Sequence, residues 1–193
     1  MEEQTNNQNK IFNIFLLGDI KTEKKTIFQE LLQNEQPEIT QPFEIQGEAI
    51  NMRILEDTPI ETIFSTEGEN NTSQAILLFY NVTDTESFNQ LKETLSKIKE
   101  MNQNDIPVNI IGNIPDSSER TVAYDDAKNF SDTYGIKYHE ISFENVSANI
   151  NDILKDVGEQ VLSKVNADTN KNEETAQKES SEQQNDNEEK KRN

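Results

Sequence analysis

The segment Gly18–Thr26 is the part of the chain whose residue types point most directly to ligand binding. It follows an apolar run, begins with a glycine and carries three lysines, Lys21, Lys24 and Lys25, in a strongly acidic chain. A helix beginning here would present free backbone N–H groups and the positive end of its dipole to an anion. A solvated first helical turn capped by Thr22 accounts for the same residues, so both interpretations stay open.

Three further segments place polar residues directly after apolar runs: Glu56–Thr62, Asn113–Asp116 and Ile141–Ser147. In parallel sheets, ligands bind at the carboxyl ends of the strands, which meet at one edge. The four segments therefore predict one shared site. Each also has an ordinary explanation, because Asp, Asn and Pro-Asp are common turn and cap residues.

The elements that must position these segments follow from the hydrophobic pattern. Strands are predicted over residues 11–17, 43–47, 49–55, 74–80, 108–111 and 136–141. Helices are predicted from apolar stripes at helical spacing: Ile27, Phe28, Leu31 and Leu32; Phe88, Leu91, Leu95 and Ile98; Ala123, Ala127, Phe130 and Tyr134; and Ile150, Ile153, Leu154, Val157, Val161 and Val165.

Turn and cap residues set the limits of these elements. Thr83 and Glu86 form a capping box ahead of the second helix. Gly47 marks a turn between two strands, Gly112 the end of the 108–111 strand, and Gly135 the end of the third helix. The order β-α-β-β-(short helix)-β-α-β-α-β-α predicts a mostly parallel sheet with helices on both faces and an antiparallel edge from the hairpin at Gly47.

Composition narrows the class of protein. The chain has 193 residues, with 37 acidic and 18 basic side chains and a net charge of −19. Such a surface repels nucleic acid and anionic lipid. The absence of cysteine excludes disulfides, thiolate metal sites and prenyl or palmitoyl anchors, and the single histidine, His139, argues against multi-histidine metal sites. With no apolar run near about 20 residues, we expect a soluble, cytoplasmic protein.

The two ends of the chain are predicted to lie outside the folded domain. Residues 1–10 are polar and predicted to be flexible. Residues 166–193 contain no large apolar side chain and are predicted to form a disordered acidic and polar tail. One domain is therefore expected over residues 11–165.

The stretch Leu78–Phe88 reads Leu-Phe-Tyr-Asn-Val-Thr-Asp-Thr-Glu-Ser-Phe. With Leu16-Leu-Gly-Asp19, Ile111-Gly-Asn113 and Ala127-Lys-Asn-Phe130, it resembles the small GTPases of the Ras/Rab superfamily. The resemblance implies a P-loop NTPase-like, three-layer α/β fold. It would have a mostly parallel six-stranded sheet, helices on both faces and one antiparallel edge strand. It also implies GTP or GDP with Mg²⁺ as ligands, and proteins of the effector or regulator type as partners.

The family's phosphate loop has the pattern G-x-x-x-x-G-K-[ST]. The resemblance places Gly18, Lys24, Lys25 and Thr26 in this loop, and Gly18 and Lys24 match the pattern. Glu23 stands in place of the second glycine, Lys25 stands in place of the Mg²⁺-binding hydroxyl, and the hydroxyl of Thr26 comes one position late. A carboxylate beside the phosphates and a missing Mg²⁺ ligand argue against tight nucleotide binding.

The switch motifs also depart from the family. Asp57 matches the outer-shell Mg²⁺ acid, and Thr40 is the plausible counterpart of the Mg²⁺-binding threonine of the first switch. Ile60 replaces the glycine that contacts the γ-phosphate, and Glu61 replaces the glutamine that orients the attacking water. No catalytic residue is therefore predicted.

The base-recognition motifs are better kept. Asn113 and Asp116 match two of the three defined positions of the family's N-K-x-D, with Ile114 in place of the lysine. Ser142 matches the first residue of S-A-K, and Glu144 replaces its lysine. The resemblance thus implies nucleotide-binding roles for Asn113, Asp116 and Ser142.

Eroded loops on a kept scaffold favour a monomeric pseudoGTPase, acting as a protein-interaction module in trafficking or signalling, with no nucleic-acid partner and no direct lipid anchor. The alternative is a divergent small GTPase that still binds GTP or GDP with slow or no intrinsic hydrolysis. A generic doubly wound domain with another ligand is disfavoured by the Leu78–Phe88 motif.

Overall fold

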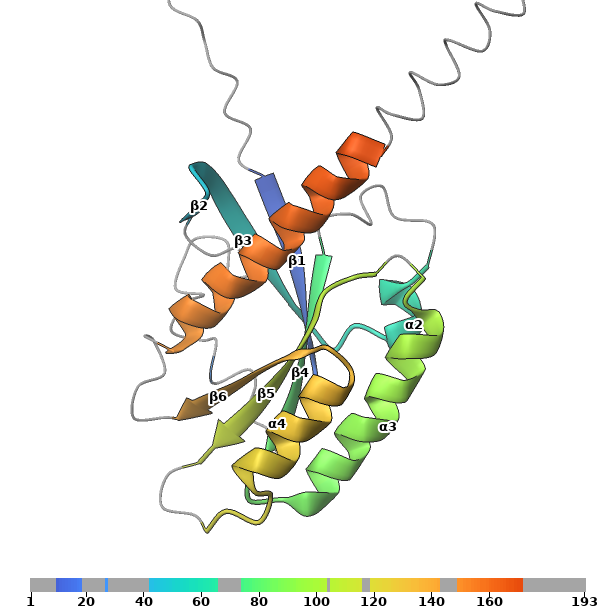
Figure 1. Ribbon diagram of the computed structural model, residues 1–193, viewed down its shortest axis with the longest axis vertical. Coiled ribbons are helices and arrows are strands. Elements are labelled where there is room, and N and C mark those ends of the chain that lie inside the picture. Colours follow the sequence, from blue (N-terminus) through green and yellow to red (C-terminus); the bar gives the residue numbers. More distant parts are fainter. Residues whose placement is uncertain are drawn as a thin grey trace, which may run out of the picture.

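The computed structural model describes residues 10–18, 27, 42–65, 74–103, 105–115, 119–142 and 149–171. Its strands are β1 (Lys10–Leu17), β2 (Phe43–Ile45), β3 (Glu48–Glu56), β4 (Gln74–Asn81), β5 (Val108–Ile114) and β6 (Lys137–Ser142). Its helices are α2 (Ile60–Ile63), α3 (Thr85–Met101), α4 (Tyr124–Thr133) and a helix over residues 149–171. The chain therefore alternates strands and helices as predicted (Figure 1).

The strands form one sheet in the order β2-β3-β1-β4-β5-β6. β3, β1, β4, β5 and β6 are paired in parallel, and β2 pairs antiparallel with β3 through a turn at Gln46-Gly47. This confirms the mostly parallel six-stranded sheet with one antiparallel edge strand. It also confirms that residues 74–80 lie in a central strand, because β4 has a parallel neighbour on each side.

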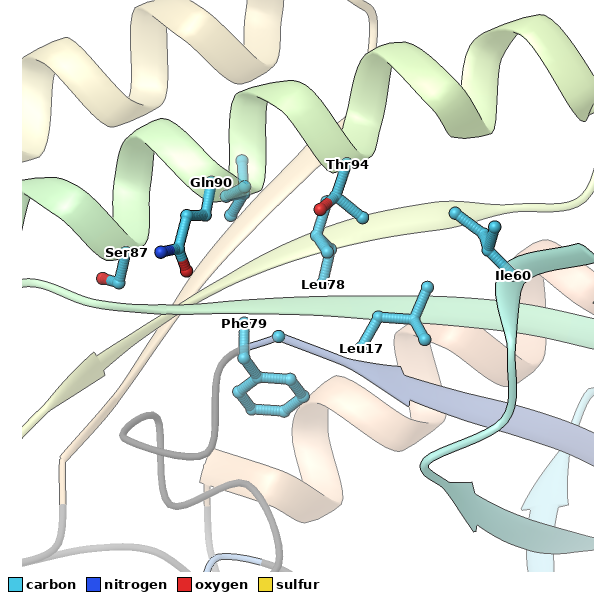
Figure 2. A pocket seen from close by; sticks show the side chains of 9 residues that line it. Leu17, Ile60, Leu78, Phe79, Ser87, Gln90 and Thr94 are labelled. Atoms are coloured by element: carbon cyan, nitrogen blue, oxygen red, sulfur yellow. The ribbon is translucent and has the colours of Figure 1, made fainter.

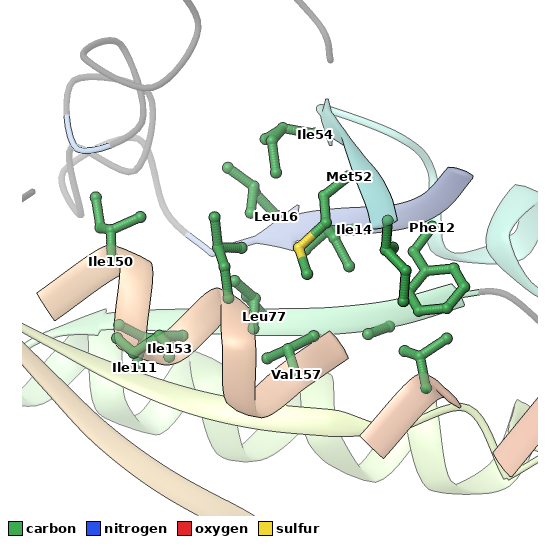
Figure 3. Packing of buried hydrophobic residues seen from close by; sticks show 14 of the residues in the cluster. Phe12, Ile14, Leu16, Met52, Ile54, Leu77, Ile111, Ile150, Ile153 and Val157 are labelled. Atoms are coloured by element: carbon green, nitrogen blue, oxygen red, sulfur yellow. The ribbon is translucent and has the colours of Figure 1, made fainter. Parts of the chain in front are cut away.

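Successive side chains of β1 point to opposite faces of the sheet and support two cores. Phe12, Ile14 and Leu16 are buried against the helix over residues 149–171. Phe15 packs in the other core, which α2, α3 and α4 cover. Helices therefore cover both faces, as predicted. Figure 3 shows three side chains of the helix pointing into the first core: Ile150, Ile153 and Val157.

The predicted capping box of α3 is wrong by one residue. Asp84, not Thr83, is the N-cap, and its Oδ1 accepts hydrogen bonds from the backbone N–H of Glu86 at 2.9 Å and of Ser87 at 3.4 Å. The Thr83 hydroxyl donates instead to Oδ1 of Asn81 at 2.7 Å. Thr83 and Asp84 could both serve as the N-cap, but the Thr83 hydroxyl is already hydrogen-bonded to Asn81 in the turn after β4.

Two other limits also differ from the prediction. β5 continues past Gly112 to Ile114, so this glycine does not end the strand. The last helix continues over residues 166–171, where Lys164 pairs with Asp168 at 2.9 Å. Polar residues at i and i+4 support a helix without apolar contacts, which composition alone does not reveal.

Several predictions fall outside the described residues. Of the helix predicted around Ile27, only Ile27 is described, and it is helical and fully buried. Residues 1–9 and 172–193, which include most of the predicted flexible ends, are also outside.

Candidate functional site

Four of the predicted site residues lie along the carboxyl edge of the sheet. Gly18 directly follows β1, and Asp57 directly follows β3. Asn113 lies next to the end of β5, paired in register with Asn81 of β4, and Ser142 is the last residue of β6. Their places at the ends of strands agree with the hydrophobic pattern, and their roles in nucleotide binding stay predictions. The other predicted site residues lie outside the described residues: Lys24, Lys25, Thr26, Thr40 and Asp116.

Gly18 has both a backbone conformation and a close contact that require glycine. Its φ is +140°, and a Cβ at this position would lie 2.6 Å from the carbonyl oxygen of Phe79 in β4. No L side chain fits so near a neighbouring backbone. The chain therefore leaves β1 in a path that only glycine allows, which agrees with its match to the first glycine of the phosphate loop.

The segment after β3 turns sharply and enters α2. Asp57 has a φ of +52°, a left-handed conformation that Asp tolerates better than most residues. Pro59 precedes the first residue of α2 with a ψ of 139°, and no side chain caps this helix. Proline fixes its own φ and stiffens the entry into the helix.

Ile60 and Glu61, at the positions of the family's glycine and glutamine, are the first two residues of α2. Ile60 is half-buried and packs against the core on the α3 face, whereas Glu61 is exposed. Ile63 is almost fully buried in the same core, and Phe64 packs against it. Three apolar side chains therefore anchor this segment to the body of the domain.

A pocket of about 210 Å³ opens between α2, α3 and the ends of β1 and β4. Ile60 lies at one end of it, and Ser87 and Gln90 of α3 lie toward the other (Figure 2). Gly18 also lines this pocket, so the pocket adjoins the predicted phosphate-loop start. Most of the remaining lining is apolar, from Leu17, Leu78, Phe79 and Leu91, and Thr94 adds one hydroxyl-bearing side chain.

Asn113 is fully buried at the end of β5. Its backbone carbonyl accepts a hydrogen bond of 3.0 Å from the N–H of Val82, the residue after β4. The carbonyl of Val82 in turn accepts 3.0 Å bonds from the N–H groups of Thr121 and Val122. The loop between β5 and α4 is therefore tied at both ends to a single residue.

The sequence does not predict a chain of polar side chains that the structure places on and beside β6. The Arg120 guanidinium donates to both carboxylate oxygens of Glu140, at 2.8 and 2.9 Å. The Tyr138 hydroxyl donates to Oε1 of Glu140, and it lies 2.7 Å from the hydroxyl of Tyr80. A glycine within a strand signals close approach by another group, so Gly112 was the one clue to this arrangement.

Burial raises the pKa of the Tyr80 hydroxyl to about 12. Burial, together with the hydrogen bond to Glu140, raises the pKa of Tyr138 well above its ordinary range. The hydrogen bonds to Glu140 raise the pKa of Arg120 as well. Both hydroxyls therefore stay protonated and the guanidinium stays charged at neutral pH.

The described residues at the ends of the strands supply neither a basic side chain nor a cluster of metal ligands for a Mg²⁺–triphosphate. None of the described residues that directly follow a strand is basic, and the described segment after β3 carries two acidic side chains, Asp57 and Glu61. Within the described ranges, no group of three His, Cys, Asp or Glu side chains could hold a metal ion. Lys25, at the position of the metal-binding hydroxyl, carries an ammonium group, which cannot coordinate Mg²⁺.

None of the helices within the described ranges is long and apolar enough to cross a membrane.

Comparison with known proteins gives three informative relatives. Ras-related protein Rab-37 of Mus musculus is 30% identical over 100 residues, which cover 51% of this chain and 45% of that protein. Ras-related protein RABD2a of Arabidopsis thaliana is 28% identical over 144 residues, covering 68% of this chain and 71% of that protein.

Ras-like protein rasU of Dictyostelium discoideum is 28% identical over 90 residues, covering 46% of this chain and 42% of that protein. The matched part of the chain thus spans less than half the length of two of these three relatives. The model of the Ras family matches residues 14–163, which include the described strands from Ile14 of β1 onward and the first fifteen residues of the last helix. With the sheet order and the residues at its carboxyl edge, this match shows that the chain belongs to the Ras family.

Proposed function

We propose that this chain is a pseudoGTPase: a Ras-family scaffold that acts as a protein-interaction module in trafficking or signalling, without GTP hydrolysis. The observation that carries the proposal is the packing of Ile60. Where the family has a mobile glycine that contacts the γ-phosphate, this chain has an apolar side chain packed against the α3-side core. The position serves packing rather than phosphate sensing.

The chemistry at the next position supports the same proposal. Glu61 is exposed at the start of α2, where the family's glutamine orients the attacking water. A carboxylate there would face the negative charge that develops during phosphoryl transfer, which raises the barrier rather than lowering it. No step of hydrolysis can therefore be assigned to the described residues.

The proposed partners are proteins of the effector or regulator type. Ras-family proteins in general act through such partners, and the relatives are named as Rab- and Ras-related proteins. The net charge of −19 favours partners with basic surfaces and disfavours nucleic acid. We propose that the chain acts as a cytoplasmic monomer that is recruited by such proteins.

A second candidate is a divergent small GTPase that binds GTP or GDP without rapid hydrolysis. Family membership and the glycine-only path at Gly18 favour it, as does the buried Asn113 at the position of the base-recognition motif. In this case Gly18, Lys24, Asn113, Asp116 and Ser142 would contact the nucleotide, and Asp57 would face its metal.

Thermal unfolding of the full chain with GTP, GDP or ATP, each with Mg²⁺ or with EDTA, separates the two candidates. A ligand at about 100 times its Kd adds about 2.7 kcal/mol of stability, which shifts Tm by several degrees for a domain of this size. We expect no guanine-specific shift at millimolar nucleotide. A Mg²⁺-dependent shift with GTP or GDP, absent with ATP and lost in Lys24→Ala, would establish the second candidate instead.

A further inference from the structure

The loop between β5 and α4 closes on one residue at the end of β4. Val82 is buried, donates to the carbonyl of Asn113 and accepts from the N–H groups of Thr121 and Val122. These three backbone bonds fix where the loop leaves the sheet and where it returns. None of these three bonds connects the loop to β6, so any contact with β6 must come from other groups.

Arg120 supplies the contact to β6. Its two terminal nitrogens donate to the two oxygens of Glu140 at 2.8 and 2.9 Å, and Nη1 also lies 3.3 Å from the carbonyl of Val122. A bidentate pair of this kind fixes orientation as well as distance. The side chains of Arg120 and Glu140 are 33% and 16% exposed, so solvent screens this pair less than most surface pairs.

Two tyrosines hold Glu140 in place from behind. Tyr138 donates its single hydroxyl hydrogen to Glu140, because a carboxylate can only accept. Tyr80, whose hydroxyl lies 2.7 Å away, must then be the donor to Tyr138. Tyr80 is fully buried, so a chain of hydrogen bonds runs from the core of the domain through Tyr138 and Glu140 to Arg120.

Gly112 makes this arrangement possible. It lies on β5 between Tyr80 of β4 and Glu140 of β6, paired in register with both. A Cβ on Gly112 would lie 2.8 Å from the Tyr138 hydroxyl and 3.1 Å from the Tyr80 hydroxyl. The two hydroxyls therefore meet in the space that a side chain on β5 would fill.

We propose that Tyr138 and Glu140 are positioning residues. Through Arg120 they hold the described ends of the loop between β5 and α4, residues 113–115 and 119–122, in one conformation, whether or not a nucleotide is bound. The inference rests on the proposed function, because an interaction module that does not respond to nucleotide needs a loop whose order does not depend on one. It adds to that function three side chains, Arg120, Tyr138 and Glu140, that hold the described ends of this loop in place of a ligand.

Amide hydrogen exchange of the full chain tests this inference locally. Tyr138→Phe removes one hydroxyl and keeps the ring. We expect it to speed exchange roughly fivefold, the value of one hydrogen bond, in peptides covering residues 113–115 and 119–122. Exchange in α3 should not change. Arg120→Lys keeps the positive charge but loses the bidentate hydrogen bonds to Glu140, so it should speed exchange in the same peptides. It provides the test if Tyr138→Phe does not fold.

Tyr134→Phe is the matched control, because Tyr134 is 42% exposed and packs against Phe130 and Lys99. Its hydroxyl takes no part in the described hydrogen bonds that link Tyr80, Tyr138, Glu140 and Arg120. It should leave the loop unchanged. Unchanged loop exchange in Tyr138→Phe and Arg120→Lys, or an equal rise across α3 and the sheet, would overturn the inference.

A second arm repeats the wild-type measurement with millimolar GDP and Mg²⁺. We expect the same loop exchange with and without GDP. Protection of the loop by GDP would overturn the nucleotide independence and the proposed function together. A failure of Tyr138→Phe to act on the loop, with GDP also without effect, would overturn the inference alone.

Discussion

Gly112 is the residue whose replacement tests the packing of the two tyrosines most directly. Its φ lies in the ordinary range, so Gly112→Ala adds a steric conflict without backbone strain. The new Cβ would press on the hydroxyls of Tyr138 and Tyr80 at 2.8 and 3.1 Å. Overpacking of this kind costs about 1–3 kcal/mol, which denaturant unfolding would show as a lower midpoint with an unchanged slope.

The control for this prediction is a double-mutant cycle with Tyr138→Phe. Removing the nearer hydroxyl makes room for the new methyl group, so the double variant should lose less stability than the sum of the single variants. Additive losses would show that the conflict lies elsewhere.

The same residue shows what sequence reasoning could and could not reach at this scale. Gly18 was predictable, because a glycine directly after a buried strand signals a special backbone path, and the structure gives it one. The sequence predicts a strand end at Gly112, because no residue near it in the sequence indicates that the hydroxyls of Tyr80 and Tyr138 meet beside it. Those tyrosines are separated by 58 positions, and only the strand order brings them together.

At the scale of elements, the strands and buried helix faces were predictable because each repeats a period along the chain. α3 buries Phe88, Leu91, Leu95 and Ile98 as its stripe indicates. Its cap was missed because Thr83 and Asp84 are both good caps, and the turn at Asn81 decided between them. Contacts between elements, such as those that hold the last helix on the sheet, have no such period.

The contact between β6 and the last helix predicts a pH dependence. On β6, Nε2 of His139 lies 3.3 Å from Oδ2 of Asp156 on the helix, without hydrogen-bond geometry, and Lys137 pairs with the same carboxylate. Burial lowers the pKa of His139 below its ordinary 6.5, Asp156 opposes this, and Lys137 adds to it. The folded protein therefore keeps this histidine neutral to lower pH than the unfolded chain does.

The sign follows from proton linkage. Below 6.5 the unfolded chain takes up a proton that the folded state resists, so stability falls as pH falls toward the depressed pKa. Tm should therefore drop between about pH 7.5 and about pH 5.5, and His139→Gln should drop less over this range. Asp156→Asn removes the opposing charge and should deepen the fall. Equal falls in wild type and His139→Gln would contradict the prediction.

At the scale of the whole molecule, charge dominates the behaviour. The chain carries 37 acidic and 18 basic residues. Two of the described ion pairs, Lys10–Glu48 and Lys128–Asp132, join exposed side chains. Exposed pairs contribute about 0–1 kcal/mol each. A net charge of −19 instead repels itself throughout the compact state.

Salt weakens both the attraction within ion pairs and the repulsion between the many carboxylates. The larger of these two effects decides whether salt raises or lowers Tm. The Debye length falls to about 10 Å at 0.1 M salt, which screens the repulsion between distant carboxylates. We expect Tm to rise by a few degrees with NaCl, and MgCl₂ alone to raise it further because a divalent cation neutralises neighbouring carboxylates better. A Tm that falls with NaCl would mean that the attractive pairs outweigh the repulsion. Because MgCl₂ alone stabilises such a chain, only a shift beyond that of MgCl₂, and specific to guanine, reports on the nucleotide site.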